Sequence, residues 1–141
     1  MRRVLVDTSA LMAMIDSRDC WFNEALDFLQ REVALYLVPD TVFSETLTLI
    51  KARLGAAAAV TVGSRIQESA TFRLHYLNPE DHRATWRIFA RYTDKEWSYV
   101  DCSILALAQR LDVAEVFAFD HHFDQMTGLG LERVPAVLRA R

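Results

Sequence analysis

The sequence is poor in cysteine, glycine and proline. Cys20 and Cys102 are the two cysteines among 141 residues, and they form no CxxC pair. This spacing excludes a disulfide framework and a cysteine-ligated zinc site of the usual kind, so we expect two small buried thiols. The four glycines and three prolines are too few for a collagen-like or low-complexity chain.

The sequence also lacks a long apolar run. No stretch approaches the roughly 18 consecutive apolar residues of a membrane-spanning helix. Near the N-terminus, Asp7 and Asp16 interrupt the apolar residues before the core of a signal peptide could form. We therefore expect a soluble, cytoplasmic protein that does not associate with membranes.

Lysine is scarce, with two residues against 14 arginines, and the net charge is −3. An acidic balance argues against a generic nucleic-acid-binding protein. Arginine, however, recognises phosphate and carboxylate groups through two parallel hydrogen bonds, which lysine cannot do. The composition therefore leaves a phosphate-bearing partner open.

The remaining pattern is that of one α/β domain over residues 1–141. Short apolar runs alternate with segments of helical period, which predicts β-α-β units and a mostly parallel sheet covered by helices. The predicted strands are 3–7, 35–38, 73–77, 115–119 and, more weakly, 131–134. The predicted helices are 9–15, 19–32, 40–54, 57–70, 79–92 and 99–111.

Two acids directly follow apolar strands. Asp7 ends "VLVD" and Asp120 ends "VFAFD". Parallel sheets bind their ligands beyond the carboxyl ends of the strands, so both acids are expected at the ligand-binding edge. The alternative is that each residue only caps the helix that follows it.

Two further acids lie within predicted helices. Asp101 falls on the apolar face of helix 99–111, where a buried acid needs a partner, a metal ion or a raised pKa. Its alternative role is a capping box with Ser98. Glu45 lies at the edge of the apolar face of helix 40–54, and a nearby Lys51 or arginine offers an ordinary ion pair instead.

Four acids gathered at one strand-end cleft would repel one another unless a cation neutralised them. Oxygen ligands without a cysteine or histidine pattern favour Mg²⁺ or Mn²⁺. Such ions activate water and stabilise phosphoryl oxygens, so the cluster predicts hydrolysis of phosphodiester bonds.

Four segments, taken in order, resemble the PIN domain, and within it the VapC-type toxin ribonucleases of toxin–antitoxin pairs. They are "LVDTSALM" at the N-terminus, Glu45 in the helix after the second strand, "WSYVDCSILALA" at 97–108 and "VFAFDHHFDQM" at 116–126. The resemblance implies a three-layer α/β/α fold with a central, mostly parallel sheet of four to five strands. It also implies Mg²⁺-dependent cleavage of RNA by an activated water, a cognate antitoxin and a homodimer.

The resemblance also implies roles for individual residues. Asp7, Glu45 and Asp101 match the three core metal-binding acids of the family, and Asp120 matches the more variable fourth. Asp124, one helical turn later, matches a position that supports a second metal ion or its water shell. Thr8 and Ser9 match the hydroxyl position after the first acid, where a side chain can hydrogen-bond an acid or a metal-bound water.

Other residues have competing interpretations. Arg83, Arg87 and Arg91 share one face of helix 79–92, which predicts either a phosphate-binding stripe or an ordinary solvated face. Arg2, Arg3 and Arg53 are further candidates for contact with RNA. For His121 and His122 the alternatives are a metal-ligand or acid/base role and a partly exposed position in a loop or helix start, and we expect the latter. Trp21, Trp86 and Trp97 could stack bases, but we expect most of them to be core or interface residues.

Two rival functions remain open at this stage. One is a non-catalytic RNA- or protein-binding module on the same fold. The other is a metal-dependent phosphatase or phospho-acceptor with a nucleophilic Asp7. Such phosphatases commonly carry a DxDxT motif, and here Ser9 occupies the place of the second acid.

Overall fold

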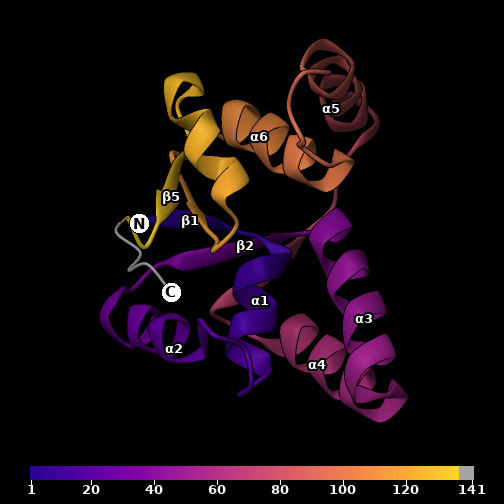
Figure 1. Ribbon diagram of the computed structural model, residues 1–141, viewed down its shortest axis with the longest axis vertical. Coiled ribbons are helices and arrows are strands. Elements are labelled where there is room, and N and C mark those ends of the chain that lie inside the picture. Colours follow the sequence, from indigo (N-terminus) through magenta and orange to yellow (C-terminus); the bar gives the residue numbers. More distant parts are fainter. Residues whose placement is uncertain (137–141) are drawn as a thin grey trace.

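A five-stranded parallel sheet forms the centre of the computed structural model, which describes residues 1–136 (Figure 1). The strand order is β3-β2-β1-β4-β5, and every neighbouring pair is parallel. The strands are β1 Arg3–Val6, β2 Leu35–Pro39, β3 Phe72–His75, β4 Glu115–Phe117 and β5 Glu132–Val134. The predicted parallel sheet is confirmed, with three strands, β1, β3 and β4, ending earlier than expected.

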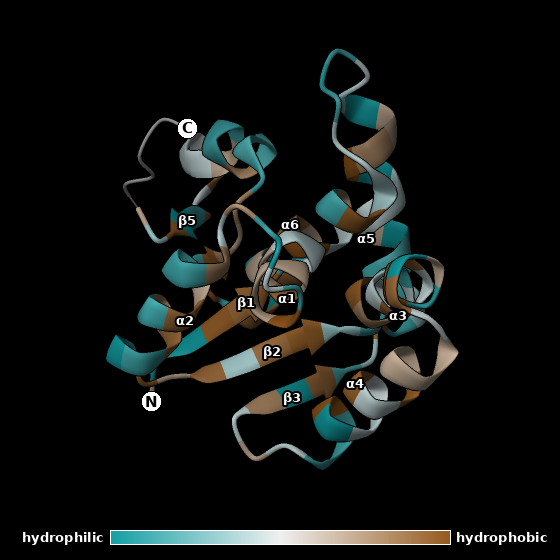
Figure 2. Ribbon diagram, turned by 60° about the horizontal axis from the view of Figure 1, so that its bottom comes forward, coloured by the Kyte–Doolittle hydropathy of each residue, from teal (hydrophilic) through white to brown (hydrophobic). Residues whose placement is uncertain are grey.

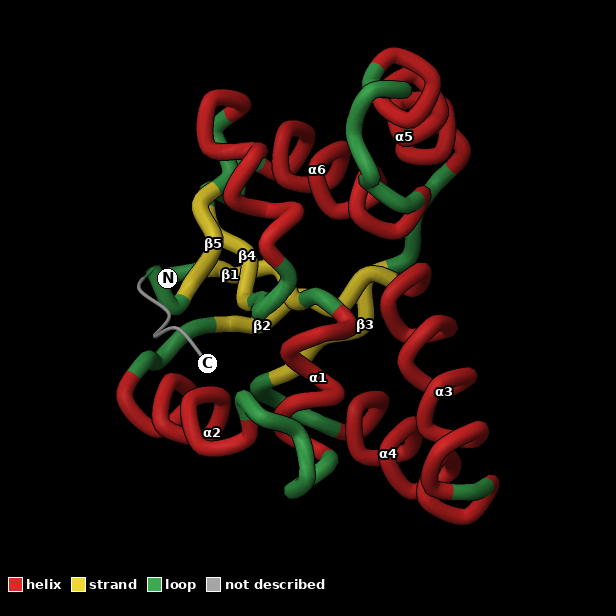
Figure 3. The backbone as a smooth tube through the Cα atoms, in the orientation of Figure 1, coloured by secondary structure: helices red, strands yellow, loops and turns green. Residues whose placement is uncertain are grey.

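Helices cover both faces of the sheet. The first four, which lie on one face, are α1 Thr8–Ile15, α2 Phe22–Arg31, α3 Asp40–Leu54 and α4 Ala56–Glu68. On the opposite face lie α5 Pro79–Arg91, α6 Tyr99–Leu111 and the 3₁₀ helix η1 His121–Leu129. Figure 3 shows the sheet between these two helical layers. The three-layer α/β/α prediction is therefore confirmed.

Apolar residues build the strands that are covered on both faces. Val4, Leu5 and Val6 of β1 are completely buried, and Figure 2 shows the central strands in the colours of hydrophobic residues. Burying a side chain of this size stabilises the fold by about 1.5–3 kcal/mol. Phe28 of α2 stacks on Phe117 of β4 with ring centroids 4.8 Å apart, which joins one helical layer to the sheet.

Local sequence signals define several helix ends. Asn78 and Asp81 form a capping box at the start of α5, with Pro79 in the first turn. Gly55 has φ +97°, a conformation that favours glycine, and it separates α3 from α4. Both boundaries lie within two residues of the predicted ones.

Two expectations about helices and thiols need correction. Helix α2 begins at Phe22 rather than at residue 19, because Asp19 and its neighbours form a turn in which the Asp19 side chain accepts the N–H of Trp21 at 2.8 Å. Cys102 is buried as expected, and burial raises the pKa of its thiol to about 11. Cys20 is exposed, because it lies in that same turn.

The order of the strands determines where a ligand would bind. The chain runs outward from β1 to β2 and β3, and then returns to the other side of β1 to form β4 and β5. Ligands of open parallel sheets bind beyond the carboxyl ends of the strands where the order reverses, which here is between β1 and β4. Within residues 1–136, no helix combines the length and the apolar character needed to cross a membrane.

Candidate active site

Asp7 follows β1 at the point where the strand order reverses. Its N–H donates to the carbonyl of Phe117 at 3.0 Å, so its backbone continues the pairing of β1 with β4. Its side chain caps α1 and accepts two hydrogen bonds from Ser9, one from the N–H at 3.1 Å and one from the hydroxyl at 2.6 Å. The helix-capping alternative is thus correct for Asp7, and it coexists with a place in the site.

Ser9 links the ends of the two central strands. While its hydroxyl donates to Asp7, its oxygen accepts the N–H of Phe119 at 3.0 Å. Phe119 directly precedes Asp120, so one hydroxyl group fixes the segments that carry both strand-end acids. Thr8, the other predicted supporting residue, has a buried hydroxyl oxygen without a hydrogen-bond partner within residues 1–136. It lines a cavity that Asp7 and Ser9 also line.

Asp101 approaches from the other helical layer. It is 5% exposed and occupies the third position of α6, where its Oδ2 accepts the N–H of Ser98 at 2.9 Å. Ser98 in turn accepts the N–H of Asp101, so the capping box predicted for this pair is present. Helix α6 is buried on more than one side, since Ser103 is also fully buried.

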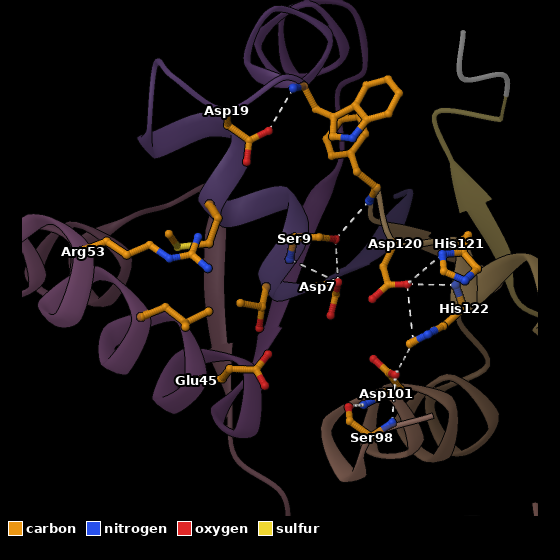
Figure 4. A pocket seen from close by; sticks show the side chains of 15 residues that line it. Asp7, Ser9, Asp19, Glu45, Arg53, Ser98, Asp101, Asp120, His121 and His122 are labelled. Carbon is orange, nitrogen blue, oxygen red and sulfur yellow. Dashed lines mark hydrogen bonds and ion pairs between the residues drawn. The ribbon is translucent and has the colours of Figure 1, made fainter. Parts of the chain in front are cut away.

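A cavity of about 620 Å³ joins these acids. It is lined by all four predicted acids, Asp7, Glu45, Asp101 and Asp120, and Figure 4 shows Glu45 reaching toward it from α3. The alternative that Glu45 pairs with Lys51 or an arginine receives no support from the ion pairs of residues 1–136, none of which includes Glu45.

His122 is a functional candidate that was considered from the sequence and set aside. It was expected to be only a partly exposed helix-start residue, and its side chain is indeed 19% exposed. However, its Nδ1 lies 3.1 Å from Asp101 Oδ2 and 3.3 Å from Asp120 Oδ1 (Figure 4). The one available signal was its place two residues after a strand-end acid. His121 is 78% exposed, in agreement with the expectation.

Burial and nearby charges make Asp7 and Asp101 costly to ionise. Burial raises the pKa of Asp7 to about 7, the hydrogen bond from the Ser9 hydroxyl opposes this change, and the charge of Asp101 reinforces it. Burial also raises the pKa of Asp101, against the hydrogen bonds from Ser98 and His122. Carboxylates placed in this way are stabilised in their charged form by a bound cation.

The ligand atoms around this cavity fit a hard divalent metal ion. Carboxylate oxygens from Asp7, Asp101, Asp120 and Glu45 face one cavity, and the unpartnered hydroxyl of Thr8 lies beside them. Ligand atoms of Asp120, His121 and His122 also lie within 4.8 Å of one another. An oxygen-rich set of this kind suits Mg²⁺ or Mn²⁺.

Asp124 does not belong to this cavity. Its Oδ1 accepts a hydrogen bond from Arg133 Nε at 2.7 Å, and the residue is not among those that line the site. Asp124 lies in the 3₁₀ helix η1, and its ion pair with the buried Arg133 side chain holds it away from the acid cavity. The structure therefore gives it an ion-pairing role and does not bring it to the acids.

The predicted arginine stripe on α5 also lies elsewhere. Arg83 is paired with Glu80, while Arg87 and Arg91 line a separate cavity of about 350 Å³ with residues of α6. Arg2 pairs with Glu32 and Glu115. Of the arginines considered from the sequence, Arg53 is the one that lines the acid cavity within residues 1–136.

Comparison with known proteins identifies relatives in sequence and in fold. A curated relative, the 23S rRNA-specific endonuclease VapC20 of Mycobacterium tuberculosis, is 26% identical over 120 residues, which cover 85% of this chain and 91% of the relative. The crystal structure of M. tuberculosis VapC20, described as a sarcin–ricin loop-cleaving toxin, superposes with a TM-score of 0.81 at 23% identity, over 91% of this chain and 95% of that one.

Two further solved structures share the fold at lower identity. A toxin–antitoxin complex from Klebsiella pneumoniae gives a TM-score of 0.64 at 18% identity and covers 96% of each chain. DNA-bound VapBC from Salmonella typhimurium gives 0.68 at 15% identity, over 94% of this chain and 98% of that one. The PIN domain family matches residues 4–129, which include all four acids of the cavity. This chain therefore belongs to the PIN domain family.

Proposed function

We propose that this protein is a metal-dependent endoribonuclease and the toxin of a toxin–antitoxin pair. The observation that carries the proposal is the convergence of Asp7, Glu45, Asp101 and Asp120 on one cavity at the switch point of the sheet. Two of these acids are buried and have raised pKa values, which is the environment that a divalent cation would stabilise. The PIN domain match and the endonuclease relative support the same activity.

The four acids would hold Mg²⁺, with Mn²⁺ as the alternative. The ion, when bound, supplies an activated water and stabilises charge on the phosphoryl oxygens. Ser9 orients Asp7 through two hydrogen bonds, and Ser98 orients Asp101 through its N–H. His122 lies against both Asp101 and Asp120, so it would fix the angle between these two ligands.

The substrate that we propose is RNA, with ribosomal RNA as the first target to test. VapC20 is described as cleaving the sarcin–ricin loop, and it is the relative that matches this chain over 85% of its length. The toxin–antitoxin structures among the relatives support a cognate antitoxin as partner. We also propose a homodimer, one functional domain over residues 1–141, and action in the cytoplasm, where the RNA would be met.

The experiment is a cleavage assay with purified protein and ribosomal RNA, in Mg²⁺ and in EDTA, followed by mapping of the new RNA ends. We expect Mg²⁺-dependent cuts at defined positions, abolished by Asp7→Asn. The matched control is Asp94→Asn, which changes an exposed acid outside the cavity and should leave the map unchanged.

Three outcomes would contradict the proposal. Protein that binds RNA but leaves it intact in Mg²⁺ and Mn²⁺ would indicate a non-catalytic binding module. New ends that carry a 2′,3′-cyclic phosphate would show attack by the 2′-hydroxyl of the RNA instead of by water. Trapping of a phosphate ester on Asp7 would instead favour the phospho-acceptor alternative.

A further inference from the structure

An aromatic pair forms part of the wall of the acid cavity. Trp21, in the turn before α2, stacks on Phe119, which precedes Asp120, with ring centroids 5.4 Å apart and planes inclined by 7°. Both side chains line the cavity. A flat aromatic surface therefore lies beside the acids that are proposed to cut RNA.

Backbone hydrogen bonds help to position both residues of the pair. The N–H of Phe119 donates to Ser9, the residue that also orients Asp7, and the N–H of Trp21 donates to Asp19. Trp21 is partly exposed, whereas Trp97 is 5% exposed and packs within the core. Packing in the core accounts for Trp97. Trp21 also packs against the core, but in addition it lines the acidic cavity and stacks on Phe119 there.

Arg53 contributes a positive charge to the same cavity. It follows Glu45 by eight residues on α3, so both residues lie on one face of that helix. Figure 4 shows its side chain reaching toward the cavity. Among the lining residues within 1–136, Arg53 is the single arginine or lysine, and five of the others are Asp or Glu. Its guanidinium is therefore suited to one anionic group of a ligand that would otherwise be repelled.

An aromatic surface and one guanidinium together match the chemistry of a nucleotide. Every base has a π-face that can stack on an aromatic side chain, and each nucleotide carries one phosphate that arginine can hold through two hydrogen bonds. The volume of about 620 Å³ lies in the range of roughly 300–1,000 Å³ typical of ligand sites. A base within a duplex is already stacked on its neighbours and cannot use such a surface.

We propose that Trp21, Phe119 and Arg53 form a nucleotide subsite next to the cleaved bond, which binds one unstacked base and one flanking phosphate. The inference rests on the proposed ribonuclease function and adds the reason why an unpaired nucleotide is selected. Stacking on Trp21 places the base, and Arg53 holds the backbone, so the next phosphate is presented to the four acids.

The first test combines an RNA lesion with a protein variant. Hairpin RNAs that contain the mapped cut site are prepared with a single abasic ribose at each position in turn. With wild-type protein, the abasic ribose at one position beside the cut should lower kcat/KM by about 5- to 100-fold. In Trp21→Ala the intact RNA should show a loss of similar size, and the same abasic RNA should show no further loss.

The control is Trp86→Ala, which removes a 60% exposed tryptophan outside the cavity and should leave the abasic profile unchanged. Trp21→Phe should keep most of the activity, because phenylalanine retains a π-face. Thermal unfolding of each variant shows whether the fold is intact. If Trp21→Ala is unfolded, Trp21→Leu is used in its place, and its abasic profile is compared with that of the wild type.

Arg53 is tested by RNA binding without divalent ions, measured through the fluorescence anisotropy of the labelled hairpin. The logarithm of the RNA-binding constant falls linearly with the logarithm of the salt concentration. Arg53→Ala should make this slope less steep by about 0.7, which corresponds to the loss of one phosphate contact on single-stranded RNA. Arg73→Ala, a change to an exposed arginine outside the cavity, should leave the slope unchanged.

The subsite and the proposed function fail in different ways. Wild-type protein that leaves all RNA intact overturns the ribonuclease. Protein that cuts RNA with equal abasic profiles in wild type and Trp21→Ala keeps the ribonuclease and overturns the subsite. The same conclusion follows if Trp21→Ala and Arg53→Ala weaken only the binding of an antitoxin peptide, because the surface would then serve a protein partner.

Discussion

Asp81 and Asp101 occupy the same local position in two neighbouring helices. Each is the third residue of its helix, each closes a capping box with the residue before the helix, and their exposed fractions are 2% and 5%. Their charge environments are opposite. Arg110 lies against Asp81 with two hydrogen bonds, whereas Asp101 faces Asp7, Asp120 and His122.

The pKa values follow these partners. Burial acts to raise the pKa of Asp81, but the hydrogen bonds and charge of Arg110, with the N–H of Asn78, hold it below its ordinary value. Burial raises the pKa of Asp101, and the charge of Asp120 adds to this change. A capping box at a buried acid is therefore no sign of function by itself. What distinguishes the site is a buried acid without an arginine.

The largest contrast is expected from one substitution at each position. Asp101→Asn keeps an oxygen for the Ser98 N–H but loses a metal-binding charge, so kcat/KM for RNA should fall by more than about 100-fold. Mutation of a residue that only hydrogen-bonds a metal ligand already lowers metal affinity or activity by about 10- to 100-fold. Its free energy of unfolding in EDTA should not decrease, because repulsion among the acids is relieved.

Asp81→Asn should show the reverse pattern. Cleavage should be retained, while the free energy of unfolding should fall by about 1–3 kcal/mol as the charge-assisted bonds to Arg110 are lost. Arg110 is 41% exposed, which keeps the loss below that of a fully buried pair. Cleavage assays and urea unfolding of both variants provide the measurements. Equal losses of activity would remove the distinction between the two acids.

The pH dependence of stability should also differ between the two regions. The pKa of Asp7 is about 7 in the folded protein, against an ordinary value of 3.8. Between these values the folded state keeps a proton that the unfolded chain releases, so stability falls as pH rises from about 4 to 7. For Asp81 the pKa is lowered, so its contribution is present above the ordinary value and is lost as pH falls below it.

Urea unfolding in EDTA at a series of pH values tests this sign. The wild type should lose stability relative to Asp7→Asn as pH rises toward 7, and Mg²⁺ should restore more stability at pH 8 than at pH 5. If the difference in free energy of unfolding between the wild type and Asp7→Asn stays constant with pH, the raised pKa of Asp7 is contradicted. Asp81→Asn serves as the control, since its difference from the wild type should change near pH 4 and not near pH 7.

A smaller effect is expected at His122, which lies between two of the acids. His122→Ala should lower kcat/KM by about 10-fold, within the range seen for residues that orient metal ligands. His122→Asn places an amide near the position of Nδ1 and should recover part of the loss. His82→Ala, at a histidine that instead contacts Tyr99, should have no effect on cleavage. If His122→Ala cuts RNA as well as the wild type, the contacts with Asp101 and Asp120 have no role in the reaction.

The order of the elements and three of the four acids of the cavity were predictable from local rules, whereas those rules left Glu45 open and the family resemblance selected it. Apolar runs define the strands, and parallel strands bring Asp7 and Asp120 to one edge. The helical period placed Asp101 on a buried face but gave no partner for it. The pairing of Asp81 with Arg110, and that of Asp101 with His122, depends on how α5, α6 and η1 pack together. Such contacts join residues 29 and 21 positions apart, and no local pattern contains them.

The smallest effect is expected at Asp124, which the family pattern grouped with the metal-binding acids. In the structure it resembles Asp81, because its carboxylate accepts a hydrogen bond from a buried arginine, Arg133, at 2.7 Å. Asp124→Asn should change cleavage by no more than about twofold and lower the free energy of unfolding by about 1 kcal/mol. The same assays measure both quantities. A loss of cleavage comparable to that of Asp101→Asn would mean that Asp124 leaves Arg133 for the metal site when RNA binds, and pairing with arginine would then no longer separate structural acids from catalytic ones.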